Sequence, residues 1–203
     1  MNTKVKELSG KTALVTGSTS GIGRATASAL GALGAAVVIT GRDAERGAQV
    51  VKEIDAIGGT ARFVAADLTD PAQVARLAEE AGDVDILVNN AGRSWFGPTA
   101  DLDVGTFDVI FDGNVRAAYL LTAAIAPAMA ARGTGNIINL ASMAGLVGLA
   151  GGAAYSATKA SMSALTRAWA AEFSPSGVRV NAVAPGPVYS DGASTEVIDN
   201  LAT

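Results

Sequence analysis

The sequence predicts an α/β fold in which helices cover both faces of a doubly wound parallel sheet, giving three layers in a single domain. Three observations lead to this prediction. Short runs of β-branched and aliphatic residues alternate with longer, alanine-rich segments of helical character. The short runs are apolar throughout, which is typical of parallel strands buried on both faces. The 203 residues show no linker, long repeat or low-complexity tract, so we expect one domain over residues 1–203.

The individual elements follow from their flanking residues. Gly58 and Gly59 end the second helix. Asp70 is a candidate cap of the third helix, whose first residue is Pro71, and Asp103 is a candidate cap of the fourth. In chain order we expect strands at 12–16, 36–40, 62–66, 85–89, 136–140 and 178–183, and helices at 21–33, 44–57, 71–81, 104–131 and 154–173.

The alternation of strands and helices also predicts the order of the strands. Right-handed crossovers place the six strands most simply in the order 3-2-1-4-5-6, which is the Rossmann arrangement. In such sheets, ligands bind outside the carboxyl ends of the strands, where the strand order reverses. We therefore expect the functional residues in the strand-to-helix turns.

Composition excludes several classes of site. The chain has no Cys, hence no disulfide, no thiolate nucleophile and no thiolate metal site. It has no His, hence no imidazole ligand and no Ser-His-Asp triad. The formal net charge of −4, from 15 basic and 19 acidic residues, does not indicate a nucleic-acid partner. We expect no metal site, and we expect acid–base chemistry to depend on Tyr, Lys, Asp or Glu.

No membrane segment is expected either. Residues 1–11 are polar and have no signal-peptide core. The longest apolar stretch, 117–131, has 15 residues and contains Pro127. A spanning helix needs about 20 residues. We therefore expect no membrane partner and a cytoplasmic location.

The turn after the first strand has the spacing of a phosphate-binding loop. Residues 16–23 read Thr-Gly-Ser-Thr-Ser-Gly-Ile-Gly, with glycines at 17, 21 and 23. Glycines let the backbone turn sharply and approach a pyrophosphate at a helix N-terminus. The segment therefore predicts a dinucleotide site that includes Gly17. The alternative is a plain strand-to-helix turn whose glycines serve close packing.

The end of the second strand bears on the choice between NAD and NADP. An acidic residue there would bind a ribose 2′-hydroxyl, whereas an Arg can pair with a 2′-phosphate. The strand ends in Thr40-Gly41-Arg42 without a carboxylate, so Arg42 favours NADP(H), with NAD(H) as the alternative. Asp43 would either neutralise Arg42 or cap the next helix. Arg42 could equally be a solvated surface residue.

Two further turns suit the same ligand. Asp67 follows the third strand, where its carboxylate could accept a hydrogen bond from an adenine amino group. Residues 89–92, Asn-Asn-Ala-Gly, follow the fourth strand, and their two amides can brace neighbouring backbone. Asp and Asn are also ordinary turn residues, so the prediction depends on their occurrence in successive turns.

Four polar residues in the second half form a candidate catalytic set. Tyr155 and Lys159 are four residues apart and share a helix face, where the ammonium would lower the pKa of the phenol. Ser142 lies at the carboxyl end of the fifth strand, where its hydroxyl could polarise a carbonyl oxygen. Asn114 lies within the long helix and could hold a water in a proton path to Lys159. A surface Tyr-Lys pair, a turn Ser and an exposed Asn are the alternatives.

Together these residues make the chain similar to a known family. From about Lys11 to Ser190 it resembles the short-chain dehydrogenase/reductase family, and its 3-oxoacyl reductases in particular. A Ser and a Tyr 13 residues apart, with a Lys four further on, behind this glycine turn form a specific joint signal. The matching segments are 16–23, 89–92, Asn114, Ser142, Tyr155, Lys159 and 185–190.

The resemblance implies a role for each matched residue. Tyr155 would be the general acid in carbonyl reduction and the base in alcohol oxidation, and Lys159 would lower its pKa and bind the nicotinamide ribose. Ser142 would orient the substrate oxygen, and Asn114 would maintain the proton relay. Similar members are usually homotetramers built through the long helices that hold Asn114 and Tyr155. The expected cofactor contacts are Gly17, Ser20, Ile22, Arg42, Asp67, Asn89, Tyr155, Lys159, Val188 and Ser190.

The resemblance also implies a longer C-terminal part. Family members of this type continue with a substrate-covering segment, a further helix and a seventh strand, whereas this sequence stops at Thr203. We therefore expect the substrate lid and the last strand to be absent.

The expected function is NADP(H)-dependent hydride transfer that interconverts a carbonyl and a secondary alcohol, with Tyr155 as acid and base. The alternatives are an NAD-dependent alcohol dehydrogenase of the same family and a non-catalytic dinucleotide-binding sensor or scaffold. The glycine spacing disfavours a sugar-nucleotide epimerase or dehydratase. Apolar residues at 95–96, 146–147 and 149 favour an uncharged or lipophilic carbonyl substrate. The expected partners are this small molecule and further copies of the chain, in a tetramer or dimer.

Overall fold

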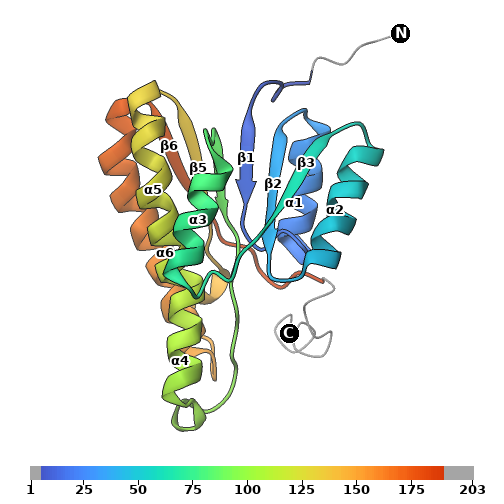
Figure 1. The fold of residues 1–203 in the computed structure, drawn as a ribbon. Coiled ribbons are helices and arrows are strands. Elements are labelled where there is room, and N and C mark those ends of the chain that lie inside the picture. The colour runs from blue at the N-terminus through green and yellow to red at the C-terminus, as the bar shows by residue number, and fades with distance from the viewer. Residues whose placement is uncertain (1–5, 190–203) are drawn as a thin grey trace.

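The computed structural model describes residues 6–189 and contains a six-stranded sheet in the order β3-β2-β1-β4-β5-β6 (Figure 1). All neighbouring strands are parallel, and the order reverses between β1 and β4. This is the predicted topology. The strands are β1 (Thr12–Val15), β2 (Ala36–Gly41), β3 (Thr60–Ala65), β4 (Ile86–Asn89), β5 (Gly135–Leu140) and β6 (Val178–Val183).

Four of the five predicted helices are single helices whose ends differ from the prediction by at most one residue, and the fifth, at 104–131, is divided into two helices. Short 3-10 turns at 99–101, 143–145 and 174–176 were not predicted. The helices are α1 (Gly21–Ala32), α2 (Ala44–Ala56), α3 (Pro71–Ala81), α4 (Val104–Phe111), α5 (Ala117–Arg132) and α6 (Ala153–Phe173).

Three helices begin at an aspartate whose side chain accepts a backbone hydrogen bond. Such a cap satisfies an amide that the helix itself leaves free. The prediction that Asp70 and Asp103 are caps is confirmed, and of the two roles considered for Asp43 the structure shows the cap. The bonds run to Asp43 from Arg46 N at 3.0 Å, to Asp70 from Ala72 N at 2.9 Å and to Asp103 from Thr106 N at 2.9 Å.

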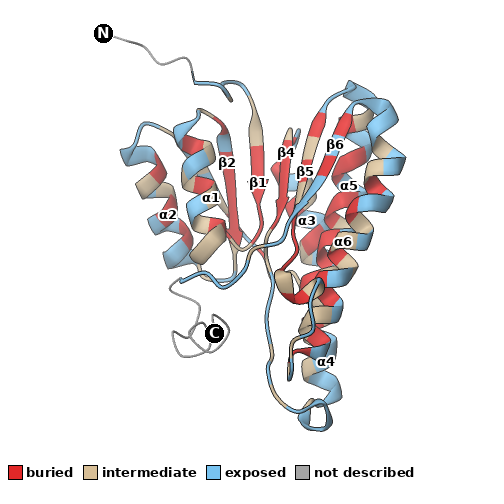
Figure 2. Ribbon diagram, turned by 180° about the vertical axis from the view of Figure 1, so that it is seen from behind, coloured by how far each residue is buried: buried red, intermediate tan, exposed pale blue. Residues whose placement is uncertain are grey.

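The sheet is the middle layer of three, as Figure 2 shows by the buried strands between exposed helix faces. Successive residues of β1 point to opposite faces. Ala13 and Val15 belong to the core cluster under α1 and α2, which includes Ile54. Leu14 belongs to the cluster under α3, α5 and α6, which includes Leu121. Strands buried on both faces explain why their sequences are apolar throughout.

The predicted helix at 104–131 is interrupted. Residues Asp112–Arg116 form a turn of π-helix between α4 and α5, and Asn114 is buried within it. Single π-turns inside α-helices occur frequently at functional sites. The backbone stays helical on both sides of the turn, so the sequence pattern runs through it unchanged.

Among the described residues, one helical segment is long and apolar enough to cross a membrane by length and composition alone, Val104–Arg132. This segment is longer than the apolar stretch at 117–131 because α4, the π-turn and α5 follow one another without a break in the helical backbone. In the structure its α5 part packs into the core, with Leu121, Ile125 and Met129 buried. Packing in the core explains the apolar composition of the α5 part of this segment.

Candidate functional site

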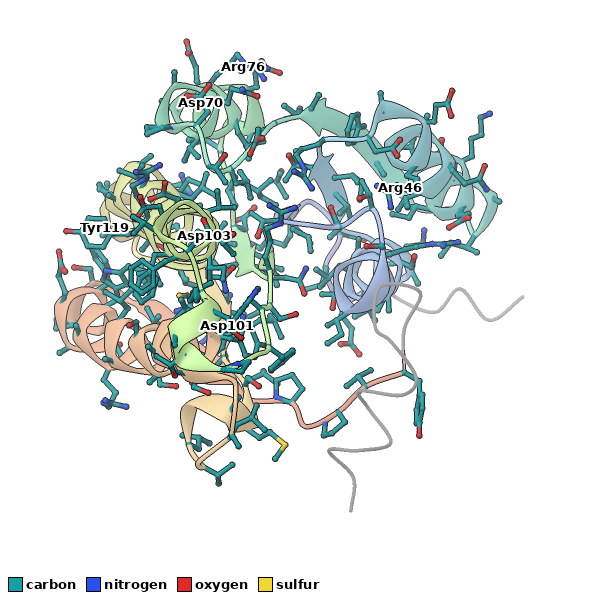
Figure 3. All side chains as sticks on the ribbon, turned by 90° about the horizontal axis from the view of Figure 1, so that it is seen from below. Arg46, Asp70, Arg76, Asp101, Asp103 and Tyr119 are labelled. Carbon is teal, nitrogen blue, oxygen red and sulfur yellow. The ribbon has the colours of Figure 1, made fainter. Side chains whose placement is uncertain are left out.

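A cavity of about 540 Å³ opens at the carboxyl edge of the sheet, the end of the molecule seen in Figure 3. Its walls come from the turns after β1 to β5, from α6 and from residues 185–188. Asn89 and Asn114 are not among its lining residues, and Ser190 lies outside the described part of the chain. The predicted residues that line it are Gly17, Ser20, Ile22, Arg42, Asp67, Ser142, Tyr155, Lys159 and Val188.

The turn between β1 and α1 is shaped to receive an anion. Gly17 and Gly21 have φ angles of 62° and 53°, a conformation that residues with a side chain rarely adopt. A Cβ at Gly23 would lie 2.4 Å from both Gly17 O and Asn90 Nδ2, so no side chain fits there. Ser20 precedes α1, but its side chain caps no amide. The first amides of α1 are therefore available to a phosphate.

Thr16 and Asn90 join this turn to the turn after β4. Thr16 Oγ1 accepts hydrogen bonds from Asn90 N and Ala91 N, both at 2.9 Å. Asn90 Nδ2 donates to Thr16 O at 2.8 Å. Asn90 lines the cavity, although it was not among the predicted site residues. The pair of amides at 89–90 was the signal, but the sequence does not show which of them faces the cavity.

Asn89 points into the protein interior. Its Nδ2 donates to Asn139 Oδ1 at 2.9 Å and to Thr122 Oγ1 at 3.2 Å. Asn139 Nδ2 in turn donates to Thr166 Oγ1 at 2.8 Å. This buried network ties β4 and β5 to α5 and α6. The Asn89 side chain, expected to contact a cofactor, is therefore engaged inside the fold.

Two arginines line the cavity beside the end of β2. Arg42 is the predicted one, and Arg46 follows one helical turn later, labelled in Figure 3. Asp43 Oδ2 lies 2.7 Å from Arg46 Nε. Asp43 thus forms its ion pair with Arg46 and does not neutralise Arg42 by direct pairing. Arg46 was not predicted, and its spacing of three residues from Asp43 was the available signal.

Asp67 lines the cavity after β3. Its Oδ1 accepts hydrogen bonds from Thr69 N at 3.0 Å and Thr69 Oγ1 at 2.8 Å. These bonds, and then the nearby guanidinium groups of Arg42 and Arg93, hold the pKa of Asp67 below its usual value. The carboxylate is therefore ionised at neutral pH and acts only as an acceptor.

Ser142 and Tyr155 meet across the cavity, from the end of β5 and the first turn of α6. Burial raises the pKa of Tyr155 above its usual value, and a hydrogen bond with the Ser142 side chain opposes this shift only in part. The expected lowering of the Tyr155 pKa is therefore wrong for the chain by itself, because burial disfavours the charged phenolate and is the largest cause acting on this group. Ser142 Oγ also accepts a bond from Ala144 N at 3.2 Å, so it serves the turn as well.

Lys159 is buried beside the phenol. Its side chain is 6% exposed, its Nζ donates to Leu140 O at 2.7 Å, and Nζ lies over the Tyr155 ring at 5.8 Å from the centroid. Burial lowers the pKa of Lys159 to about 8. At neutral pH the cavity therefore keeps an ammonium next to Tyr155.

Asn114 holds the β4 turn against α6. Its Oδ1 accepts from Arg93 N at 2.7 Å, and its Nδ2 donates to Arg93 O at 2.8 Å and Thr158 Oγ1 at 3.0 Å. It is buried, not exposed. A Cβ at Gly92 would lie 3.2 Å from Asn114 Oδ1 and 3.5 Å from Lys159 Nζ. Gly92 thus separates the two side chains without filling the space between them.

A family model and several known proteins are similar to this chain in sequence. The family model described as short chain dehydrogenase matches residues 11–200. The chain is 43% identical over 180 residues to ketoacyl reductase 1 of the granaticin polyketide synthase of Streptomyces violaceoruber, covering 86% of this chain and 66% of that protein. It is 35% identical over 204 residues to the 7alpha-hydroxysteroid dehydrogenase of Clostridium sardiniense, covering 97% and 78%. The chain thus spans just under two thirds of the first of these relatives.

Solved structures agree with the predicted fold. A protein described as a betaketoacyl-ACP reductase has 54% identity and a TM-score of 0.87, with 93% of this chain and 77% of that chain covered. A protein described as an NAD(P) dependent gluconate 5-dehydrogenase from Beutenbergia cavernae, with bound NADP, has 40% identity and a TM-score of 0.91, covering 97% and 80%. A metagenomic short-chain oxidoreductase in complex with NADP has 45% identity and a TM-score of 0.85, covering 90% and 85%.

Proposed function

The chain belongs to the short-chain dehydrogenase/reductase family of NAD(P)-dependent oxidoreductases, and from that premise we propose that it interconverts a carbonyl and a secondary alcohol with NADP(H). One observation carries the proposal. A single cavity joins the phosphate-binding turn at Gly17 to the group formed by Ser142, Tyr155 and Lys159. Cofactor and substrate could therefore meet beside the phenol.

The residues present fit a dinucleotide. The uncapped start of α1 and the glycine turn would hold the pyrophosphate, and ionised Asp67 would accept a bond from the adenine amino group. Lys159 would bind the nicotinamide ribose, with Val188 near the carboxamide. When bound, the reduced nicotinamide supplies a hydride, which is two electrons and a hydrogen nucleus, to the carbonyl carbon.

Three observations support NADP(H) over NAD(H). Strand β2 ends without a carboxylate, and Arg42 lines the cavity next to it. Asp43 pairs with Arg46, so it leaves Arg42 to the 2′-phosphate. Two solved relatives hold NADP.

Tyr155 is the proposed proton donor. During reduction, the carbonyl carbon gains the hydride and Tyr155 Oη gives its proton to the oxygen, leaving a phenolate that regains a proton from solvent. During oxidation, the phenolate removes the alcohol proton. Burial raises the pKa of Tyr155, so at neutral pH the phenol is protonated, which is the form that can donate a proton. The Ser142 hydroxyl would donate a second hydrogen bond to the substrate oxygen.

Lys159 and Asn114 are proposed to support this transfer. The Lys159 ammonium would stabilise the phenolate that forms when Tyr155 loses its proton. Asn114 is a positioning residue in the proton path, because it holds Thr158 and the turn at Gly92, the two neighbours of Lys159.

The wall beyond Tyr155 supports an uncharged, lipophilic carbonyl substrate. Phe96 contacts the Tyr155 ring. A Cβ at Gly152 would lie 3.0 Å from Leu149 Cδ2 and 3.4 Å from Phe96 Cε1, so these two side chains form one apolar surface. Trp95 instead lines a separate apolar hollow between α4 and α6. Of the predicted pair at 95–96, only Phe96 contacts the Tyr155 ring.

We propose that the protein forms a homo-oligomer, a tetramer or dimer, in the cytoplasm. The support is an exposed apolar surface on α4 and α5, where Val104 is 76% and Tyr119 is 52% exposed. Tyr119 is labelled in Figure 3, on the α5 side of the molecule. Among the described residues, no cluster of acidic side chains could hold a metal ion.

Purified protein incubated with NADPH and a panel of ketones and aldehydes tests the function. We expect loss of NADPH absorbance together with formation of the alcohol. Tyr155→Phe should bind NADPH as the wild type does and show no turnover. Binding without turnover across the whole panel would support a sensor or scaffold, and absence of dinucleotide binding would overturn the proposal.

A further inference from the structure

Arg93 lines the same cavity as Arg42 and Arg46 but comes from the turn after β4. Its backbone is fixed on both sides by one side chain, because Asn114 accepts from Arg93 N at 2.7 Å and donates to Arg93 O at 2.8 Å. The Arg93 residue is exposed. The Arg93 side chain therefore starts from a fixed stretch of backbone in the cavity wall.

The cavity carries more positive charge than the proposed function uses. Its lining includes three guanidinium groups and the Lys159 ammonium, but only one carboxylate, that of Asp67. Arg46 is paired with Asp43, Arg42 is proposed for the 2′-phosphate, and Lys159 lies at Tyr155. Within residues 6–189, no carboxylate lies within ion-pair distance of Arg93.

The position of Arg93 relates it to the phosphate-binding turn. A Cβ at Gly17 would lie 2.9 Å from Ala91 Cα, so the turns after β1 and β4 are in direct contact. Arg93 is two residues beyond Ala91. Besides the Thr69 hydrogen bonds, the Arg42 and Arg93 guanidinium groups both help to lower the pKa of Asp67, so both lie near the same carboxylate.

We propose that Arg93 is a cofactor-binding residue whose guanidinium pairs with the pyrophosphate, facing it from the β4 turn while the glycine turn holds it with backbone amides. This inference rests on the proposed dinucleotide function. NADP carries negative charge at two places, the 2′-phosphate and the pyrophosphate. Arg42 serves the first, which only NADP has, and Arg93 serves the second, which NAD and NADP share. A guanidinium suits both phosphates because it is planar and can donate two parallel hydrogen bonds to two oxygens of one phosphate group.

Two fragments of the cofactor separate these roles. ADP-ribose has the pyrophosphate without a 2′-phosphate, and adenosine 2′-monophosphate has the 2′-phosphate without a pyrophosphate. Their dissociation constants can be measured by calorimetry on the full chain, independently of turnover. Arg93→Gln should weaken ADP-ribose about tenfold or more, the loss expected for one charge-assisted hydrogen bond, and leave adenosine 2′-monophosphate nearly unchanged. Arg42→Gln should show the reverse pattern.

The controls distinguish this inference from the function it rests on. Arg93→Lys should keep part of the ADP-ribose affinity. Arg179 is an exposed residue of β6 that does not line the cavity, so Arg179→Gln should change the affinity for neither fragment. Unchanged ADP-ribose binding in Arg93→Gln, or equal weakening of both fragments, would overturn the role of Arg93 while leaving the dinucleotide site. A wild-type chain that binds neither fragment would overturn both proposals. Since the hydrogen bonds between Asn114 and Arg93 involve only the backbone of Arg93, these substitutions leave the turn in place.

Discussion

The rings of Phe96 and Tyr155 meet in an edge-to-face arrangement, with a centroid distance of 5.7 Å and an interplanar angle of 64°. The two residues come from the β4 turn and from α6. A backbone hydrogen bond from Gly97 N to Gly151 O, at 2.9 Å, holds these segments together. Edge-to-face contacts are favourable for aromatic pairs. The phenol that we propose as proton donor therefore has an apolar ring as a direct neighbour.

Phe96→Ala should raise KM for a lipophilic ketone about tenfold and leave KM for acetone nearly unchanged, because the removed ring contacts only the larger substrate. Steady-state kinetics with cyclohexanone and acetone measure the difference. An equal fall in kcat for both ketones would instead show that Phe96 orients the Tyr155 ring.

The pH dependence of catalysis should follow the raised pKa of Tyr155. Because burial keeps the phenol protonated, kcat/KM for reduction should stay constant up to the usual phenol value of about pH 10 and fall only above it, as the proton needed by the substrate is lost. The rate of alcohol oxidation should rise with pH over the same range. An ionisation well below the usual phenol value of about 10 would show that neighbouring positive charge outweighs burial.

Lys159 should make stability depend on pH in the alkaline range. Its pKa is about 8 in the folded chain and has its ordinary value of 10.5 in the unfolded chain. Between these values the unfolded chain binds more protons, so the free energy of unfolding rises with pH, by about 3 kcal/mol at most. Denaturant titrations at pH 7 and pH 10 should show wild type gaining stability relative to Lys159→Met. The exposed Lys52→Met is the matched control and should show no such gain.

Arg42→Ala should weaken NADPH binding about ten- to a hundredfold and barely change NADH binding, since one charge-assisted bond contributes roughly 1.5 to 3 kcal/mol. Fluorescence titration of both reduced cofactors measures this preference. Arg179→Ala removes the same charge away from the cavity and should affect neither cofactor. Tighter binding of NADH than NADPH by the wild type would contradict the role of Arg42.

Gly92→Ala should leave the fold intact and lower kcat about ten- to a hundredfold. The added Cβ would lie 3.2 Å from Asn114 Oδ1 and 3.5 Å from Lys159 Nζ, which shifts one or both groups. The φ angle of Gly92 is not positive, so alanine fits its backbone. A melting curve checks the fold and initial rates check kcat. Wild-type kcat would show that the spacing of Asn114 and Lys159 does not matter.

The sequence by itself determined the sheet order, most of the element bounds and the edge that holds the site; the third strand begins two residues before its predicted start, and the predicted helix at 104–131 is interrupted. These features depend on local patterns: apolar runs mark buried strands, and Asp70 with Pro71 starts α3 at the predicted residue. The crossover rule then leaves one simple arrangement. The spacing of Ser142, Tyr155 and Lys159 likewise placed all three residues on one cavity.

Only the tertiary structure decided which partners the side chains of neighbouring residues contact. Asn89 and Asn90 are adjacent and identical, yet one joins a buried network and the other braces the glycine turn. Asp43 lies beside Arg42 in the chain but pairs with Arg46 in space.

The chemistry of the site was decided in the same way. The spacing of Tyr155 and Lys159 predicted a lowered phenol pKa, whereas burial raises it. The helical pattern around Asn114 ran through the π-turn that buries this residue. Side-chain direction, desolvation and ion pairing depend on atoms brought together from distant parts of the chain. A local sequence pattern does not determine those contacts, so it cannot predict these properties.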